Sequence, residues 1–207
     1  MCISAEASFA VAAALVPCGA YCLCVARRRN LDYVPLALVP FFFSVQQCCE
    51  GFVWLGYKTP GALGFLFFAI AFWPIWMPWS IYCLSRRVEA LFFVGWGLCW
   101  LVLYILIAGH PIGVSVVNHS LRYEIGLADD PFMRLVYLVN VVLPVIFSKD
   151  RILWAMGGAG VVTAILSHLF LSYAFVSLWC FFAALISLSL CYLFYKMDNP
   201  APADHFD

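Results

Sequence analysis

Residues 34–57 read VPLALVPFFFSVQQCCEGFVWLGY, an apolar run that is interrupted by Gln46, Gln47 and Glu50. A helix needs about 20 apolar residues to cross the hydrocarbon core of a bilayer, so this run is sufficient for one crossing. A carboxylate facing hydrocarbon is costly, and a glutamate inside a membrane therefore normally faces the bundle interior, has a partner or is protonated. The segment 46–51 is thus the strongest indication in the sequence of a functional position.

The composition of the whole chain points to the same class of protein. Of its 207 residues, 66% are hydrophobic and 11% are charged, and the mean hydropathy is +0.98. Soluble domains contain roughly 45–50% apolar and about 25% charged residues. The formal net charge is zero, which gives no electrostatic basis for binding a nucleic acid. The chain is therefore expected to be a polytopic membrane protein whose principal partner is the lipid bilayer.

Seven apolar runs are long enough to cross a bilayer, which predicts an all-α fold with a single seven-helix transmembrane domain over residues 1–197. The expected helices are 4–26, 34–57, 60–84, 88–109, 131–148, 152–171 and 174–196, with one long outer loop at 110–130. The tail 198–207 carries two prolines and three aspartates, a composition typical of a disordered segment.

The basic residues predict the orientation of this bundle. If the segments alternate in direction, eight of the eleven Lys and Arg residues fall on one side. These are Arg27, Arg28, Arg29, Arg86, Arg87, Lys149, Arg151 and Lys196. Because cytoplasmic loops carry the excess of Lys and Arg, the N-terminus is expected outside and the C-terminus in the cytoplasm. We expect a multi-pass protein of the cell inner membrane.

Local signals mark several helix ends and one hairpin. Thr59 and Asp130 each precede a proline, which predicts capping side chains at two helix starts. In the outer loop, residues 114–117 and 121–125 flank Asn118-His119-Ser120, a pattern that favours a short hairpin over the mouth of the bundle.

Most side chains capable of chemistry fall near the outer face in this orientation. Glu50 lies about two turns below the outer surface, with Gln46 or Gln47 and Trp54 on the same helical face. The candidate catalytic residues are Glu50 and His119. The candidate ligand-binding residues are Gln46, Gln47, Trp54, Trp73, Tyr123 and Trp179. The candidate ligands of a transition metal, zinc or copper, are Cys2, His119, His168 and Cys180.

Each of these candidates also has a structural interpretation. Buried amides and a protonated acid stabilise contacts between helices in lipid, which would explain Glu50 and its glutamines without any function. Cys2 and Cys180 lie near the same outer face and could form a disulfide there instead of binding a metal. Most of the ten cysteines are expected to be small apolar fillers.

Several motifs resemble one family. The opening residues 1–9, MCISAEASF, resemble the MCxSAxAS start of bacterial membrane proteins known only as a domain of unknown function. Residues 46–54, 72–74, 118–123 and 175–182 are similar to its other motifs, so the similarity spans nearly the whole chain. Asn118 stands where a second histidine beside His119 is expected, which weakens a two-histidine ligand set. The resemblance implies kinship and no mechanism, because the family has no assigned activity.

Two functional hypotheses follow from these observations. The first is an integral membrane protein with an outward-facing polar pocket that binds a ligand or a metal, and that could act as an enzyme on a lipid-soluble or outer-side substrate with Glu50 as base or ligand. The second is a structural or assembly subunit of a membrane complex, in which the same residues only tie helices together and the partner is another membrane protein.

Overall fold

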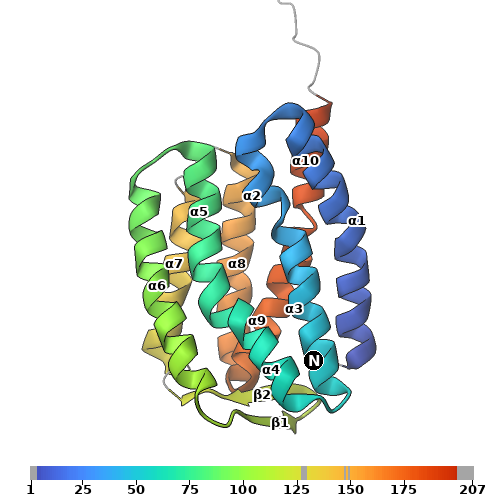
Figure 1. Cartoon of the computed structure of the whole chain (residues 1–207), viewed down its shortest axis with the longest axis vertical. Coiled ribbons are helices and arrows are strands. Elements are labelled where there is room, and N and C mark those ends of the chain that lie inside the picture. Colours follow the sequence, from blue (N-terminus) through green and yellow to red (C-terminus); the bar gives the residue numbers. More distant parts are fainter. Residues whose placement is uncertain (1–3, 127–129, 147, 149, 200–207) are drawn as a thin grey trace, which may run out of the picture.

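The structure is a computed structural model that describes residues 4–126, 130–146, 148 and 150–199. Within this part the chain is a bundle of long helices, with a two-stranded hairpin across one end (Figure 1). The predicted tail 198–207 falls almost entirely outside the described residues.

The elements follow one another along the chain with short connections. They are α1 (Ala5–Arg29), η1 (Leu31–Tyr33), α2 (Val34–Ala37), α3 (Val39–Trp54), α4 (Lys58–Leu66), η2 (Phe67–Phe72), α5 (Trp73–Ser85), α6 (Glu89–Ala108), β1 (Gly113–Val117), β2 (Ser120–Glu124), α7 (Pro131–Ile146), α8 (Arg151–Leu171), η4 (Ser172–Ala174), α9 (Phe175–Ser187) and α10 (Leu190–Asp198). Each of the seven apolar runs coincides with one of these helices or with consecutive helical segments.

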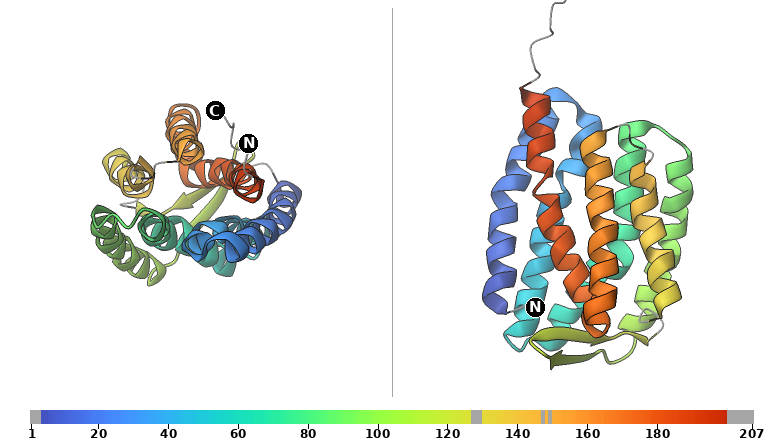
Figure 2. Two further views of the ribbon diagram at one scale, coloured as in Figure 1. Left: turned by 90° about the horizontal axis from the view of Figure 1, so that it is seen from above. Right: turned by 180° about the vertical axis from the view of Figure 1, so that it is seen from behind.

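Five helical segments of the described chain are long and apolar enough to cross a membrane. They are Ala5–Arg29, Leu31–Trp54, Lys58–Ser85, Glu89–Ala108 and Arg151–Asp198. A shorter apolar helix covers Pro131–Val145. The last of the five reverses direction at η4, so that α8 and α9 pack side by side (Figure 2). The expectation of a mostly helical protein with several helices that could span a membrane is therefore confirmed.

The helices form two layers (Figure 2). One layer contains α1, α3, α5 and α6, and the other contains α7, α8, α9 and α10. Between the layers, α1 contacts α10, α3 contacts α9 and α5 contacts α7. The interior between the layers is consequently bounded by helices that are distant in sequence.

The two ends of the bundle differ in charge. At the end opposite the hairpin, the Arg29 Nε donates to Asp198 Oδ1 at 3.2 Å, and Arg86 pairs with Asp32. These pairs join the ends of α1 and α5 to neighbouring segments. The hairpin end holds Lys58, whose ammonium group donates to the Val114 carbonyl at 3.4 Å. The basic clusters that follow α1 and α5 thus lie at the same end of the bundle (Figure 1).

The predicted hairpin is confirmed, together with one of the two predicted caps. Asn118 and His119 form the turn, with φ of 47° and 56°, the left-handed backbone of a two-residue hairpin turn. The Asp130 carboxylate accepts from the Phe132 amide at 2.8 Å, as expected of a helix cap. The cap predicted at Thr59 is wrong, because α4 already begins at Lys58.

Some backbone carbonyl groups of the helices accept hydrogen bonds from side chains of neighbouring helices. Pro78 has no N–H, so the Pro74 carbonyl one turn earlier loses its helical donor. The Asn140 amide of α7 donates to that carbonyl at 2.8 Å. At the break between α2 and α3, the Trp76 indole donates to the Pro35 carbonyl at 3.0 Å. These bonds matter because lipid offers no donors to exposed backbone groups.

We predict that Asn140→Ala lowers the free energy of unfolding by about 0.5–2 kcal/mol, the usual range for a hydrogen bond between helices in a membrane protein. Pro78→Ala restores an N–H that can serve the Pro74 carbonyl. The cost of losing Asn140 should therefore shrink in the Pro78→Ala background. Thermal unfolding in detergent of the two single variants and the double variant measures this coupling.

Leu135→Ala, on an exposed face of the same helix, is the matched control for Asn140→Ala. Strict additivity of the Asn140 and Pro78 substitutions would contradict the proposed role of the asparagine.

Candidate functional site

The polar side chains of α3 lie in the interior of the bundle. Gln46, Gln47 and Glu50 all have 0% of their surface exposed. Gln46 and Glu50 are one helical turn apart and share a face. At Gly51, a Cβ atom would lie 2.7 Å from the Phe9 ring of α1. The glycine therefore permits the close approach of α1 to α3 beside Glu50.

Glu50 is bonded across the two layers. Its Oε1 accepts a hydrogen bond of 2.5 Å from the Ser177 hydroxyl of α9, which is also fully buried. The bond joins residues 127 positions apart in the sequence. It follows that Glu50 faces the protein interior, as the sequence predicted, and that its partner is a neutral hydroxyl.

Gln46 is bonded to a third helix. The Trp73 indole N–H donates to Gln46 Oε1 at 2.7 Å. Trp73 begins α5 directly after the π-helical segment η2, a distortion often found at functional sites. Its ring stacks on Phe43 of α3, with 4.0 Å between the ring centroids. The Gln46 side-chain oxygen is bonded to Trp73, which leaves the amide nitrogen to donate elsewhere. Within the described residues this buried nitrogen has no hydrogen-bond partner.

A central cavity of about 100 Å³ lies between the two layers. Its lining is mostly apolar and comes from α2, α3, α5 and α7–α10. Trp73 lines the cavity and bonds Gln46, so it connects the cavity to the buried polar residues of α3. Gln46, Gln47 and Glu50 are not among the residues that line it. In the described chain the buried polar residues of α3 therefore lie beside this apolar cavity and not in its wall.

A second, smaller cavity of about 30 Å³ lies nearer the hairpin. Tyr137, Trp179 and Cys180 line both cavities and separate them. The rings of Tyr137 and Trp179 meet edge to face at 5.5 Å, and the Trp179 indole donates to the Gly160 carbonyl at 3.0 Å. Two of the predicted site residues, Trp179 and Cys180, thus stand between the central cavity and the hairpin end.

His168 lies at the end of α8 beside a basic residue. The Arg134 guanidinium approaches His168 Nδ1 at 3.4 Å and the Ser172 hydroxyl at 3.0 Å, and it stacks over the Phe175 ring at 4.7 Å. A guanidinium has only donors, so in this arrangement Nδ1 of His168 acts as the acceptor. One of the two nitrogens that could bind a metal is therefore already engaged.

The remaining predicted residues lie apart from Glu50. His119 is exposed at the hairpin turn, whereas Glu50 is fully buried between α3 and α9, so the structure does not place the two candidate catalytic residues in one pocket. Tyr123 is buried and stacks on Phe65, with the ring centroids 5.0 Å apart. Trp54 is half-buried at the end of α3. Cys2 lies outside the described residues, and so does any disulfide with Cys180.

The structure brings together three cysteines that the sequence did not single out. Donor atoms of Cys18, Cys22 and Cys191 all lie within 4.8 Å of one another, and Cys18 and Cys191 are joined as a disulfide. The spacing of Cys18 and Cys22 on one helical face was a usable signal. Their partner was not readable, because Cys191 is 173 positions from Cys18 and only the folded bundle brings it near.

Comparison with protein families identifies the family of the chain. It belongs to a family of unknown function, DUF6629, whose model matches residues 1–205. The predicted resemblance to an uncharacterised family is thereby confirmed. Neither a curated protein nor a solved structure matches the chain.

We predict that Ser177→Ala lowers the free energy of unfolding by about 0.5–2 kcal/mol, because the bond to Glu50 joins α3 to α9. The same substitution should cost much less in a Glu50→Leu background, where the acceptor is already absent. Glu50→Gln keeps an acceptor oxygen and should preserve most of the Ser177 effect. Thermal unfolding of these variants in detergent gives the coupling.

Ser85→Ala is the matched control, since the Ser85 hydroxyl bonds a carbonyl of its own helix at 2.8 Å. An equal cost of Ser177→Ala in the wild type and in Glu50→Leu would show that the bond does not hold α3 to α9.

Proposed function

We propose that this protein is a multi-pass membrane protein that binds a small lipid-soluble ligand in its central cavity. The observation that carries the proposal is a mostly apolar cavity lined by helices of both layers. Ligand sites in proteins are typically apolar cavities with a few polar groups that set orientation, and bundles form them between helices.

The size of the cavity limits the ligand. An engineered cavity of about 150 Å³ lined by apolar side chains binds benzene. The central cavity, at about 100 Å³, is of the same order. It suits one aromatic ring or a short length of hydrocarbon chain rather than a whole lipid. A charged group would meet no compensating charge among the lining residues.

In this proposal the polar residues of α3 position the wall of the cavity. Gln46 fixes the indole of Trp73, and Trp73 presents its ring to the cavity. Glu50 holds α9 through Ser177, and Cys180, one turn further along α9, lines the cavity. Glu50 therefore does not contact the ligand directly. This favours a ligand-binding function of the protein over one in which Glu50 is a catalytic base.

The proposed topology has seven crossings in the cell inner membrane, with the hairpin outside. It is supported by the position of the basic clusters at the end of the bundle away from the hairpin.

A second candidate function is that of a structural or assembly subunit. It is favoured by the bonds Glu50–Ser177 and Trp73–Gln46, which tie three helices together and would do so without any ligand. Its partner would be another membrane protein. The two functions differ in whether the cavity is occupied.

We predict that Gly160→Leu abolishes occupancy of the cavity. Gly160 lines the cavity, and a Cβ atom there would meet nothing within 4 Å, so a larger side chain can fill the space. A phenyl diazirine that partitions into lipid should, on illumination, label cavity residues such as Met156 and Cys180 in the wild type. Labelling at these positions, mapped by peptide mass spectrometry, should fall several-fold in Gly160→Leu.

Gly158→Leu is the matched control, because Gly158 is exposed on the same helix and its substitution leaves the cavity open. Labelling of the exposed Trp154 reports the lipid-facing background in every sample. Cavity labelling that is equal in wild type and Gly160→Leu would contradict the ligand-binding proposal and favour the structural one.

The transition-metal form of the proposal, with zinc or copper, has its own test. Metal analysis of the purified protein, with Glu50→Gln and His119→Ala beside the wild type, tests it. Because Glu50 is buried between α3 and α9 and His119 is exposed at the hairpin turn, we expect no single metal ion whose binding is lost in both variants. Metal absent from the wild type, with loss of a co-purifying membrane protein in the variants, would favour the assembly subunit.

The proposed orientation predicts the accessibility of the two ends. In intact cells, a membrane-impermeant maleimide should label Val116→Cys, because Val116 is exposed on β1. Arg87→Cys, at the opposite end, should be labelled only after the membrane is permeabilised. Labelling is measured relative to the wild type, which accounts for the native cysteines. The reverse pattern would place the hairpin in the cytoplasm.

A further inference from the structure

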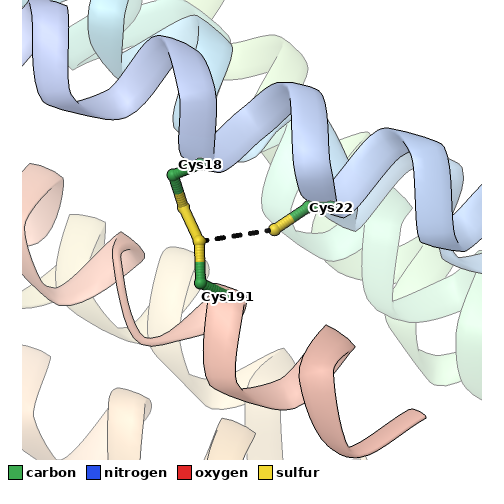
Figure 3. A group of neighbouring side chains, drawn as sticks. All are labelled: Cys18, Cys22 and Cys191. Atoms are coloured by element: carbon green, nitrogen blue, oxygen red, sulfur yellow. Dashed lines mark hydrogen bonds between the residues drawn. A yellow bond between two sulfur atoms is a disulfide. The ribbon is translucent and has the colours of Figure 1, made fainter. Parts of the chain in front are cut away.

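Cys18, Cys22 and Cys191 form a cluster of sulfur atoms between α1 and α10. Cys18 and Cys22 are one helical turn apart on α1, so both face the same neighbour. Cys191 stands in the first turn of α10. Figure 3 shows the three side chains converging on one point between the helices. Cys22 has 0% of its surface exposed and Cys18 has 6%.

Cys191 is within reach of both cysteines of α1. It is joined to Cys18 as a disulfide, with 5.9 Å between the Cα atoms, inside the usual range for such bonds. The Cys22 Sγ lies 4.0 Å from the Cys191 Sγ and donates its S–H to it. The third thiol therefore touches the disulfide sulfur that both pairings would share.

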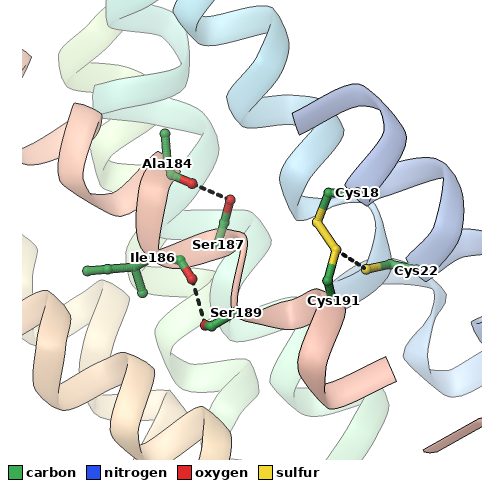
Figure 4. The surroundings of a disulfide bond; sticks show 7 residues. All are labelled: Cys18, Cys22, Ala184, Ile186, Ser187, Ser189 and Cys191. Atoms are coloured by element: carbon green, nitrogen blue, oxygen red, sulfur yellow. Dashed lines mark hydrogen bonds between the residues drawn. A yellow bond between two sulfur atoms is a disulfide. The ribbon is translucent and has the colours of Figure 1, made fainter. Parts of the chain in front are cut away.

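The helix that carries Cys191 is separate from the helix before it. The helix is interrupted at Leu188 and Ser189, between α9 and α10. Figure 4 shows Ser187 and Ser189 beside the three cysteines. The hydroxyls of Ser187 and Ser189 donate to the carbonyls of Ala184 and Ile186, each at 2.6 Å. These hydroxyl bonds lie at the interruption itself, so α10 begins as a helical segment of its own.

We propose that the three cysteines are a thiol–disulfide exchange site in which Cys191 pairs with either Cys18 or Cys22. A disulfide with a purely structural role needs no third thiol in contact with it. Packing as an apolar side chain does not require the thiol of Cys22 to face the sulfur of Cys191. The proposal does not depend on a ligand in the central cavity.

The exchange step is balanced within the protein. The sulfur of Cys22, as thiolate, attacks the sulfur of Cys191 and forms a new S–S bond. The bond between Cys191 and Cys18 breaks, and its electron pair goes to the sulfur of Cys18. Cys18 takes up the proton that Cys22 released. One disulfide and one thiol exist before and after the step, so no oxidant or reductant is consumed.

The exchange changes the residue of α1 to which α10 is covalently linked. Cys22 lies one turn beyond Cys18 along α1, a displacement of about 6 Å. Pairing with Cys22 instead of Cys18 therefore draws the start of α10 toward the charged end of the bundle. Ser187 and Leu190, on either side of the break, line the central cavity. The pairing would then alter one wall of the cavity, a consequence that rests on the proposed function.

Mapping of disulfides in variants tests the exchange directly. The purified protein and its variants are oxidised with copper–phenanthroline, alkylated, digested without reduction and analysed by mass spectrometry. Cys22→Ser should retain only the Cys18–Cys191 link. Cys18→Ser should form a Cys22–Cys191 link to a similar extent. The wild type, quenched in acid after incubation, should contain both links.

Two controls make the result decisive. The double variant Cys18→Ser with Cys22→Ser should form no link to Cys191, although Cys24 is exposed on the same helix. Cys24→Ser should leave the wild-type pattern unchanged. Free thiols at Cys22 and Cys191 in oxidised Cys18→Ser, under conditions that link Cys18 to Cys191 in Cys22→Ser, would overturn the proposal. Absence of the link in Cys22→Ser would overturn it as well.

The effect on the cavity is measured separately. Diazirine labelling of Met156 should differ between the Cys18→Ser and Cys22→Ser proteins once each is fully oxidised. Equal labelling, with both links present, would leave the exchange site in place and remove only its effect on the cavity. The mapping uses no ligand, so its failure is distinct from failure of the proposed function.

Discussion

The bundle depends on one constraint: a polar group placed among apolar helices must find its partner inside the protein. The constraint is visible where prolines remove backbone donors. The Pro74 carbonyl, left without a helical donor by Pro78, is served by Asn140 from another helix. The same logic places the Glu50 carboxyl against Ser177 and the Gln46 amide oxygen against Trp73. Each bond joins two different helices, so the hydrogen bonds that satisfy these polar groups also determine which helices pack against each other.

This constraint explains how much of the fold was predictable. Long apolar runs predict where the helical segments lie, and Asp130 and Asn118-His119 carry local signals for a cap and a turn. The sequence also predicted that Glu50 faces inward. Breaks inside the runs were harder to foresee, because a break at Leu188 and Ser189 depends on carbonyls being bonded by Ser187 and Ser189 after folding.

The candidate site was less predictable than the fold. Sequence position gives the depth of a residue along its helix, but it does not say which helix stands opposite. Depth along the helices predicts Glu50 and His119 near the same face, yet Glu50 is buried between α3 and α9 and His119 is exposed at a turn. Cys18 and Cys191 were assigned to a filler role for the same reason, since only the contact of α1 with α10 makes them partners.

The separation of polar residues from the cavity shapes the mechanism. A carboxyl group within the cavity could act on a ligand, but it would need solvation that apolar walls do not provide. Glu50 is instead buried and bonded to Ser177 of α9, the helix that also carries Cys180 of the cavity wall, and Gln46 bonds Trp73, which lines the cavity. An apolar ligand would then meet rings and methylene groups held in place by hydrogen bonds behind them. Such a wall keeps its shape when the cavity is empty, which lowers the cost of ordering it on binding.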